Sequence, residues 1–479
     1  MQLRDLLCDV ELTSQPQADG IEITGIAYDS RLVRPGDAFV AIKGYQTDGH
    51  QYIDAAVKNG AAAVVAQTPC ECGVPLAVAK NSRRALANMS ATFYGYPAKD
   101  LKVIGITGTN GKTTVTYLIK SILEYGGYKV GLLGTNQNMI GGRVIKTERT
   151  TPEALELHRL FAEMRKEDVD YCVMEVSSHS LMLDRVYGIP FAYAAFTNLT
   201  QDHLDFHKTM DEYAKAKARL FSMCYKAVIN ADDAYAEKII ADADCKIIQY
   251  GIHKKSDIMA QNIKYNQRGV LFDVETPFGR ENIRLNIPGE FSVYNALAAI
   301  GICQSAGIGI SDIAKALILA QGVKGRAEVV NIPTNYTVMI DYAHTPDGIK
   351  NILTAVRGFA KGRVVTVFGC GGDRDAAKRP KMGKIAGDLS DFCIVTSDNP
   401  RSEDPQAIIS DITAGMADVK APYVVIENRR EAIRYAMKNA QENDVIVLAG
   451  KGHETYQILK EGTVPFDERA IVKEILAEL

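Results

Sequence analysis

A glycine-rich stretch with a lysine and two threonines holds the residues that are best suited to chemistry. Residues 102–119 read KVIGITGTNGKTTVTYLI, so that an apolar run leads into glycines, Lys112 and Thr113. Glycines at a strand-to-helix turn let backbone N–H groups approach a phosphate chain, and the helix dipole adds to the attraction. A lysine can contact the β- and γ-phosphates, and a threonine hydroxyl can ligate Mg²⁺. We therefore predict a nucleotide-binding loop, although Ile106 stands where the usual G-x-x-x-x-G-K-[ST] spacing has its first glycine.

Two further polar residues follow apolar runs and could complete a magnesium site. Glu175 ends the run YCVME, and an acid there can reach a metal at the mouth of a neighbouring phosphate loop. Asp202 and His203 follow the run YAAFTNL. From the residues alone, His203 either caps a turn or binds the metal, and both readings stay open.

Two other glycine-rich strand ends raise the alternative of a dinucleotide-binding dehydrogenase. They read VFGCGGDRD and LAGKGHETY. In the G-x-G-x-x-G pattern the third glycine would fall on Arg374 in the first stretch and on Thr455 in the second. The dinucleotide interpretation is therefore weak.

The elements that must position these residues form three blocks. A chain of 479 residues is too long for one core. Apolar strand-like runs alternate with amphipathic helices through the chain, a pattern typical of α/β folds with parallel sheets. We predict domains over residues 1–98, 99–324 and 325–479, the central one carrying the nucleotide loop. In open α/β sheets ligands lie at the carboxyl ends of the strands.

Bulk properties exclude several classes of protein. The net charge of −3 gives no general electrostatic attraction to nucleic acid. No apolar run reaches the roughly 18 residues of a membrane span, and the first residues lack a signal-peptide pattern. The nine cysteines are scattered and odd in number, which argues against a disulfide framework. We expect a cytoplasmic protein without nucleic-acid or membrane partners.

The order of the motifs resembles that of the Mur ligases, which are ATP-dependent amide-forming enzymes of bacterial cell-wall synthesis. The resemblance covers all three blocks and rests on GTNGKTT, EVSSHSL, NLTQDHLDFH, PGEFSVYNALAA, GRAE and DYAHTPD. It implies an N-terminal α/β domain that binds a UDP-sugar, a central P-loop ATPase domain and a C-terminal Rossmann-like domain. It also implies activation of a carboxylate by ATP as an acyl phosphate, with Mg²⁺ as cofactor and small molecules as substrates. We expect the protein to be a monomer.

The resemblance assigns the nucleotide and catalytic residues. Those implied to bind ATP are Gly108, Thr109, Asn110, Gly111, Lys112, Thr113, Thr114, Asn295, Arg326, Asp341 and His344. The catalytic set is Lys112, Lys217, His203 and Glu175, and the metal ligands are Thr113, Glu175, His203 and Lys217 as a carbamate. The carbamate, formed with CO₂, would turn an ammonium into an anionic ligand. The residues alone do not distinguish Lys217 from Lys215.

The resemblance also assigns the other two substrates. For the UDP-sugar-dipeptide acceptor it implies Ser30, Thr150, Thr151, Ser177 and Arg185, with a further contact region at GYQTDG. Arg149 stands where some relatives have an asparagine contact. DNPRSEDP resembles the version of the family that adds meso-2,6-diaminopimelate, and implies binding by Arg374, Asp398, Asn399, Pro400, Arg401, Gly450 and Glu454. An Arg401 guanidinium suits the second carboxylate of this amino acid.

Two alternatives stay open at this point. The same ligation could use L-lysine, which lacks the distal carboxylate that Arg401 would hold. A P-loop ATPase of another kind would couple hydrolysis to movement, and it would release phosphate without an acceptor or an amino acid.

Overall fold

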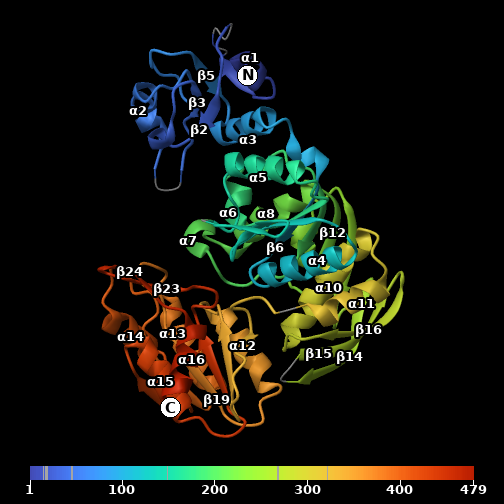
Figure 1. The fold of residues 1–479 in the computed structure, drawn as a ribbon, viewed down its shortest axis with the longest axis vertical. Helices are drawn as coiled ribbons and strands as arrows, with labels where there is room; N and C mark the ends of the chain where they lie inside the picture. Colours follow the sequence, from blue (N-terminus) through green and yellow to red (C-terminus); the bar gives the residue numbers. More distant parts are fainter. Residues whose placement is uncertain (15, 17–19, 45–46, 148, 267–268, 321) are drawn as a thin grey trace.

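The computed structural model describes residues 1–14, 16, 20–44, 47–147, 149–266, 269–320 and 322–479. Its elements form three bodies that follow one another in chain order along the longest axis, from blue at the top to red at the bottom (Figure 1). Each body has its own sheet of mainly parallel strands with helices packed against it. The predicted α/β fold class is confirmed.

The N-terminal sheet has the strand order β1-β5-β4-β3-β2, in which only β1 is antiparallel to its neighbour among the described strands. The strands are β1 (Leu12–Ser14), β2 (Gly25–Ala27), β3 (Asp37–Val40), β4 (Ala63–Ala66) and β5 (Leu76–Ala79). The helices are α1 (Leu3–Leu6), α2 (Ile53–Lys58) and α3 (Ser82–Phe93). β3 and β4 are buried along their whole length, as expected of central parallel strands covered on both faces. Asn81 caps α3 by accepting from the N–H groups of Arg83 and Arg84, which fixes the start of this helix.

The central sheet has the order β16-β15-β14-β13-β12-β11-β6-β10-β7-β8-β9. Its parallel part comprises β6 (Lys102–Thr107), β7 (Val130–Leu133), β10 (Tyr171–Glu175), β11 (Phe191–Phe196), β12 (Cys224–Asn230) and β13 (Lys246–Gly251). β6 lies between β10 and β11, so its carboxyl end is flanked by the ends of both neighbours. The nucleotide loop therefore leaves the sheet at the edge where parallel α/β sheets bind ligands.

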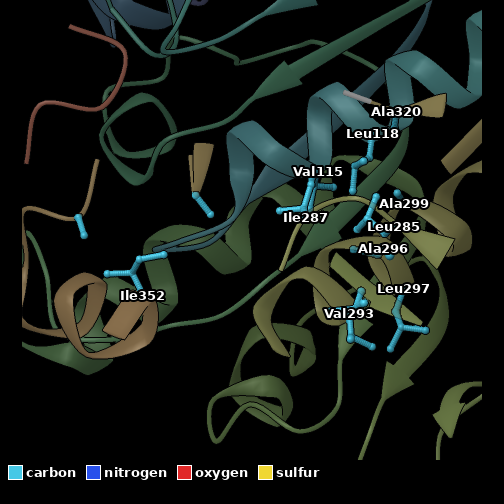
Figure 2. Packing of buried hydrophobic residues seen from close by; sticks show 14 of the residues in the cluster. Val115, Leu118, Leu285, Ile287, Val293, Ala296, Leu297, Ala299, Ala320 and Ile352 are labelled. Carbon is cyan, nitrogen blue, oxygen red and sulfur yellow. The ribbon is translucent and has the colours of Figure 1, made fainter. Parts of the chain in front are cut away.

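Both faces of the central sheet are covered by helices. Successive residues of β6 point to opposite faces, so Val103 joins one apolar cluster while Ile104 and Ile106 join the other. One face carries α4 (Lys112–Tyr125), α10 (Glu290–Ser305) and α11 (Ile310–Leu319), and the other carries α5 (Ala154–Lys166), α6 (Ser178–Met182) and α8 (Met210–Ala218). Figure 2 shows residues of α4 and α10 in the first cluster. This packing holds α4 rigidly behind the loop.

The edges of the central sheet are antiparallel, which the predicted parallel alternation does not include. β14 (Ile258–Asn266), β15 (Gly269–Thr276) and β16 (Gly279–Leu285) form a meander at one edge, and β8 (Asn138–Ile140) and β9 (Arg143–Ile145) lie at the other. β15 alternates buried and half-buried residues because one face packs on the core. The short helices α7 (Leu204–His207) and α9 (Ala236–Ile240) complete this body.

The C-terminal sheet has the order β17-β18-β22-β19-β20-β21. Its strands are β17 (Glu328–Val329), β18 (Thr337–Asp341), β19 (Val364–Phe368), β20 (Phe392–Val395), β21 (Tyr423–Val425) and β22 (Val445–Ala449), followed by the hairpin of β23 (Tyr456–Leu459) and β24 (Gly462–Pro465). Its helices are α12 (Pro346–Arg357), α13 (Lys378–Leu389), α14 (Pro405–Ala414), α15 (Arg429–Lys438) and α16 (Glu468–Glu478). α12 begins with Pro346, and the Thr345 hydroxyl caps it by accepting from Gly348 N. Among the described helices, none combines the length and the apolar character that a bilayer crossing requires.

Candidate active site

The loop between β6 and α4 adopts backbone conformations that favour glycine. Gly108 has φ +149° and Gly111 has φ +85°. A Cβ on Gly108 would lie 1.8 Å from Thr197 Oγ1, and one on Gly111 would lie 2.4 Å from Asn295 Oδ1. The loop thus needs both glycines, for its conformation and for its close contacts.

Replacing Gly108 with alanine should therefore damage nucleotide binding. The Cβ would displace Thr197, whose hydroxyl donates to Asn110 O at 2.6 Å within the same loop. We expect a lower unfolding temperature and ATP affinity reduced by about tenfold or more, since backbone strain of this kind costs about 1–3 kcal/mol. Calorimetric titration with ATP measures the effect. Gly142→Ala is the control, because a Cβ there meets nothing within 4 Å. Equal ATP affinity in Gly108→Ala and wild type would contradict this role.

Two lysine side chains converge on the carbonyl of Gly108. Lys112 Nζ donates to Gly108 O at 2.9 Å and to Thr109 O at 2.8 Å. Lys217 Nζ reaches the same Gly108 O at 2.9 Å from α8, and this side chain is only 1% exposed. Burial lowers the pKa of Lys217 well below its ordinary value, and the Lys112 ammonium lowers it further. Burial also lowers the pKa of Lys112. Two amino groups thus lie beside the loop, and burial favours the uncharged form of each.

Glu175 and Thr113 supply oxygen atoms next to these lysines. Glu175 ends β10 and pairs in register with Ile106 of β6, so its carboxylate lies at the sheet edge from which the loop leaves. The buried carboxylate accepts from Thr135 N at 2.9 Å and from Thr135 Oγ1 at 3.0 Å. The Thr113 hydroxyl lies 3.4 Å from an Arg326 nitrogen that donates to it. A hydroxyl and a carboxylate are the hard oxygen donors that Mg²⁺ prefers, so this donor set fits the ion.

His203 lies at the start of α7. It has φ +53°, its ring nitrogen Nε2 lies 3.4 Å from Asp202 Oδ2, and its ring contacts that of His179 with centroids 4.9 Å apart. Its side chain is 47% exposed, which leaves an imidazole accessible beside Asp202. In the part of the chain that the structure describes, no cluster of three or more His, Cys, Asp or Glu residues forms a metal site.

A cavity of about 540 Å³ lies between the loop, α10 and α12. Of the residues implied to bind ATP, it brings together Asn110, Gly111, Thr114, Asn295, Arg326 and Asp341. Its apolar part includes Ile287, Phe291 and Tyr294. Gly108, Thr109, Lys112 and Thr113 lie in the adjoining loop and helix start, whereas His344 faces a second cavity and contacts Tyr342 O through Nδ1 at 2.7 Å.

Arg326 links the C-terminal body to the central body at this cavity, and Asp341 supports the segment that carries it. Asp341 accepts from Ala327 N at 2.7 Å and from Ala343 N at 2.8 Å, which anchors the segment that carries Arg326. The Arg326 guanidinium stacks over the Tyr342 ring at 4.7 Å. Burial raises the pKa of Asp341, while the Arg326 charge opposes the rise. These contacts aim Arg326 at the nucleotide loop.

Asp347 makes a further contact between the bodies, which no motif in the sequence predicts. It accepts through Oδ2 from Asn110 Nδ2 at 2.7 Å and from Thr200 Oγ1 at 3.0 Å. Asp347 and Thr200 line both cavities and therefore mark where the two meet. The spacing of these residues in the chain gives no sign of this contact.

The second cavity, of about 990 Å³, contains most of the residues implied to bind the amino acid. It brings together Arg374, Asp398, Asn399, Arg401, Gly450 and Glu454, along with His203 and Asp202. Arg401 has φ +54° and donates through Nη1 to Gly372 O at 2.7 Å, which orients its guanidinium. Pro400 does not line the cavity in the described structure. Pro400 is buried, and its carbonyl oxygen packs so close to Gly372 that a Cβ atom added there would lie 2.0 Å from it.

Four of the five residues implied to bind the acceptor form one group. Thr151 Oγ1 donates to Glu175 O at 2.9 Å and accepts from Ser177 N at 3.1 Å, and Arg185 Nη1 donates to Thr151 O at 3.1 Å. Thr150 Oγ1 lies 3.0 Å from Thr135 Oγ1, and the same Thr135 hydroxyl contacts the Glu175 carboxylate. Ser30 lies apart, buried in the N-terminal body. Tyr45 and Gln46 of GYQTDG lie outside the described residues.

A cluster of arginines surrounds a buried glutamate beside this group. Glu153 pairs with Arg185 Nε at 2.9 Å, with Arg149 Nη1 at 2.9 Å and with Arg83 Nη1 at 3.4 Å. Arg83 comes from α3 of the N-terminal body and was not identified from the sequence. One carboxylate with these arginines leaves excess positive charge, which suits an anionic ligand lying between the two bodies.

Comparison with known proteins places this arrangement in a family. Residues 22–94 match the Mur ligase family catalytic domain, residues 106–303 the Mur ligase middle domain and residues 325–452 the Mur ligase glutamate ligase domain. The UDP-N-acetylmuramoyl-L-alanyl-D-glutamate–2,6-diaminopimelate ligase of Clostridium botulinum is 53% identical, over 96% of each chain. The enzyme of the same name from Caldanaerobacter subterraneus subsp. tengcongensis is 54% identical, over 100% of this chain and 99% of the relative. A solved structure with that name has a TM-score of 0.72 and 32% identity, covering 100% of this chain and 99% of the other.

Proposed function

Because the chain belongs to the Mur ligase family, we propose that it joins 2,6-diaminopimelate to UDP-N-acetylmuramoyl-L-alanyl-D-glutamate in an ATP-dependent reaction. The observation that carries this proposal is that the two cavities meet at the nucleotide loop, where Asp347 and Thr200 line both. Thr151, implied to hold the acceptor, bonds to the backbone of Glu175 at the same sheet edge. The three substrates can therefore meet at one point.

The reaction that this arrangement supports has two steps. A carboxylate oxygen of the acceptor attacks the γ-phosphorus of ATP, which forms an acyl phosphate and releases ADP. The amine of the amino acid then attacks the acyl carbon, and phosphate leaves with one oxygen of the original carboxylate, while the amine loses a proton. Lys112 and Arg326 would hold the phosphates, because two polyanions must approach each other in the first step.

Magnesium and a carbamate would complete the phosphate site. Thr113 and Glu175 would hold one Mg²⁺, with His203 and carbamylated Lys217 as further ligands. When bound, the ion neutralises phosphate charge. Only an uncharged amine adds CO₂, so the lowered pKa of buried Lys217 supports the carbamate. Since ATP and a nucleotide-linked sugar are the substrates, we also propose that the enzyme acts in the cytoplasm, as a monomer that contains all three sites in one chain.

Arg401 should determine the choice of amino acid. We expect Arg401→Ala to lower kcat/KM for meso-diaminopimelate by about 10- to 100-fold, since a charge-assisted pair is lost, and to leave lysine turnover low but unchanged. Measuring kcat/KM for both amino acids tests this expectation. Arg280→Ala, which removes an exposed arginine of β16, is the control. An unchanged ratio between the two amino acids would remove Arg401 from the recognition of the distal carboxylate.

Phosphate release measured with ATP and the nucleotide dipeptide, comparing diaminopimelate, lysine and ornithine, tests the proposed function. We expect release that depends on the acceptor and is fastest with diaminopimelate. Faster release with lysine would favour the lysine-adding alternative. Rapid release with ATP alone would favour an ATPase of another kind.

A further inference from the structure

Lys451 contacts residues that line the second cavity and has no role in the proposed reaction. Its side chain is fully buried. Nζ donates to Asn399 Oδ1 at 2.9 Å and to Glu454 Oε2 at 3.0 Å, and Asp398 Oδ1 lies 3.6 Å away. Two of the three N–H donors of this ammonium group are thus used in hydrogen bonds to the side chains of Asn399 and Glu454, and the Asp398 carboxylate pairs with it at ion-pair distance. The polar side chains that contact Lys451 all line the second cavity, so Lys451 acts on the residues of the cavity wall.

The partners of Lys451 come from two separate loops. Asp398 and Asn399 follow β20, whereas Glu454 follows β22, and β19 lies between these strands. Asn399 Nδ2 also donates to Glu454 Oε2 at 2.9 Å, and Asn399 Oδ1 accepts from Ile458 N at 2.9 Å. Lys451, Asn399 and Glu454 thus form a closed set of hydrogen bonds that fixes one loop against the other.

The charge of Lys451 also matters at this position. Asp398 and Glu454 are carboxylates that both line the cavity, and Lys451 lies between them. Buried carboxylates without a cation are costly, and they would either move apart or draw in other cations. With Lys451 in place, Glu454 stays at the cavity wall in a defined orientation, where it can accept from an ammonium group of the amino acid.

We propose that Lys451 is a positioning residue for the incoming amino acid, which acts by holding Asn399 and Glu454 in the orientation that binds it. This inference rests on the proposed function, because it requires the second cavity to bind an amino acid. It predicts that the loss of Lys451 affects only the second step of the reaction, since acceptor and ATP use other loops.

Replacing Lys451 with methionine keeps the length of the side chain and removes its charge. We expect the KM for diaminopimelate to rise by about 10- to 100-fold, as for other lost bonds to charged groups, while the KM values for ATP and acceptor change by less than about twofold. Hydroxylamine in place of the amino acid traps the acyl phosphate as a hydroxamate without using the cavity. We expect Lys451→Met to form hydroxamate at nearly the wild-type rate.

A double-mutant cycle separates positioning from a general structural role. If Lys451 acts through Glu454, then Lys451→Met should add little to the defect of Glu454→Gln. Lys460→Met, in the exposed turn between β23 and β24, is the control and should behave as wild type. An unchanged KM for diaminopimelate, fully additive defects, or loss of hydroxamate formation would each overturn the proposal. Failure of the wild-type enzyme to form an amide with diaminopimelate would instead refute the proposed function.

Discussion

Replacing Lys112 with alanine should slow phosphoryl transfer by at least about 10³-fold and leave acceptor binding intact. Lys112 is the loop cation whose ammonium bonds to the carbonyls of Gly108 and Thr109, so it already lies where the terminal phosphates of ATP would be bound. Removal of one preorganised donor to a developing charge typically costs about 10²–10³ in rate, and a full positive charge should cost at least about 10³. We expect kcat to fall by this factor in the phosphate-release assay.

The acceptor should still bind to Lys112→Ala, because the residues that we propose hold it, Thr150, Thr151, Ser177 and Arg185, lie on other loops. Titration of the nucleotide dipeptide should give a dissociation constant within about twofold of the wild type. Lys120→Ala is the matched control, since Lys120 lies on the same helix and pairs with Glu124. A kcat above about a tenth of the wild-type value would contradict the role of Lys112.

Replacing Lys217 with alanine should have a similarly large effect for a different reason. We expect kcat to fall by about 10³-fold or more, because the anionic ligand that the carbamate would provide is lost. Short carboxylates such as acetate or propionate should restore part of the rate, since they can supply an oxygen ligand in the space left by the side chain. The rescue should rise with carboxylate concentration and saturate.

Lys215→Ala is the matched control for this experiment. Lys215 belongs to the same helix, α8, but it is exposed, whereas Lys217 is buried against the nucleotide loop. The control should keep wild-type activity and show no response to carboxylates. Wild-type activity in Lys217→Ala would refute the carbamate, and a loss of activity without rescue would make Lys217 a structural residue.

Lys215 and Lys217 show how much of the site can be predicted from the sequence, because only one of the two lysines is buried at the nucleotide loop. Nothing in the charges of DEYAKAKARLF separates the two lysines. Helical periodicity does separate them, because Tyr213, Lys217 and Leu220 are spaced for one face of a helix, and this face is buried in the structure. The spacing of these three residues is thus the sequence signal for the buried lysine, although lysine is a residue type that mostly lies at the surface.

Local features of the fold were predictable because short stretches of chain determine them. The nucleotide loop and the alternation of strands and helices both depend on neighbours in sequence. The antiparallel meander β14–β16 was not predicted, because the direction in which two strands pair depends on the pairing partner and not on the residues of either strand alone.

Contacts between the bodies could not be predicted from the sequence, for a related reason. Asp347 meets Asn110 across 237 residues, and Arg83 meets Glu153 across 70. Each of these residues has an ordinary local role available, such as Asp347 in the first turn of α12. The partner that each residue contacts depends on how the bodies pack against each other, and no sequence pattern predicts this packing.

Isotope transfer from the acceptor to phosphate tests the central claim most directly. The reacting carboxylate of the acceptor would be labelled with ¹⁸O, and the phosphate released with diaminopimelate would be examined by mass spectrometry or by phosphorus NMR. We predict one ¹⁸O atom in phosphate for each amide formed, because the carboxylate oxygen that attacks ATP leaves with the phosphate. Amide formation with unlabelled phosphate would contradict activation through an acyl phosphate.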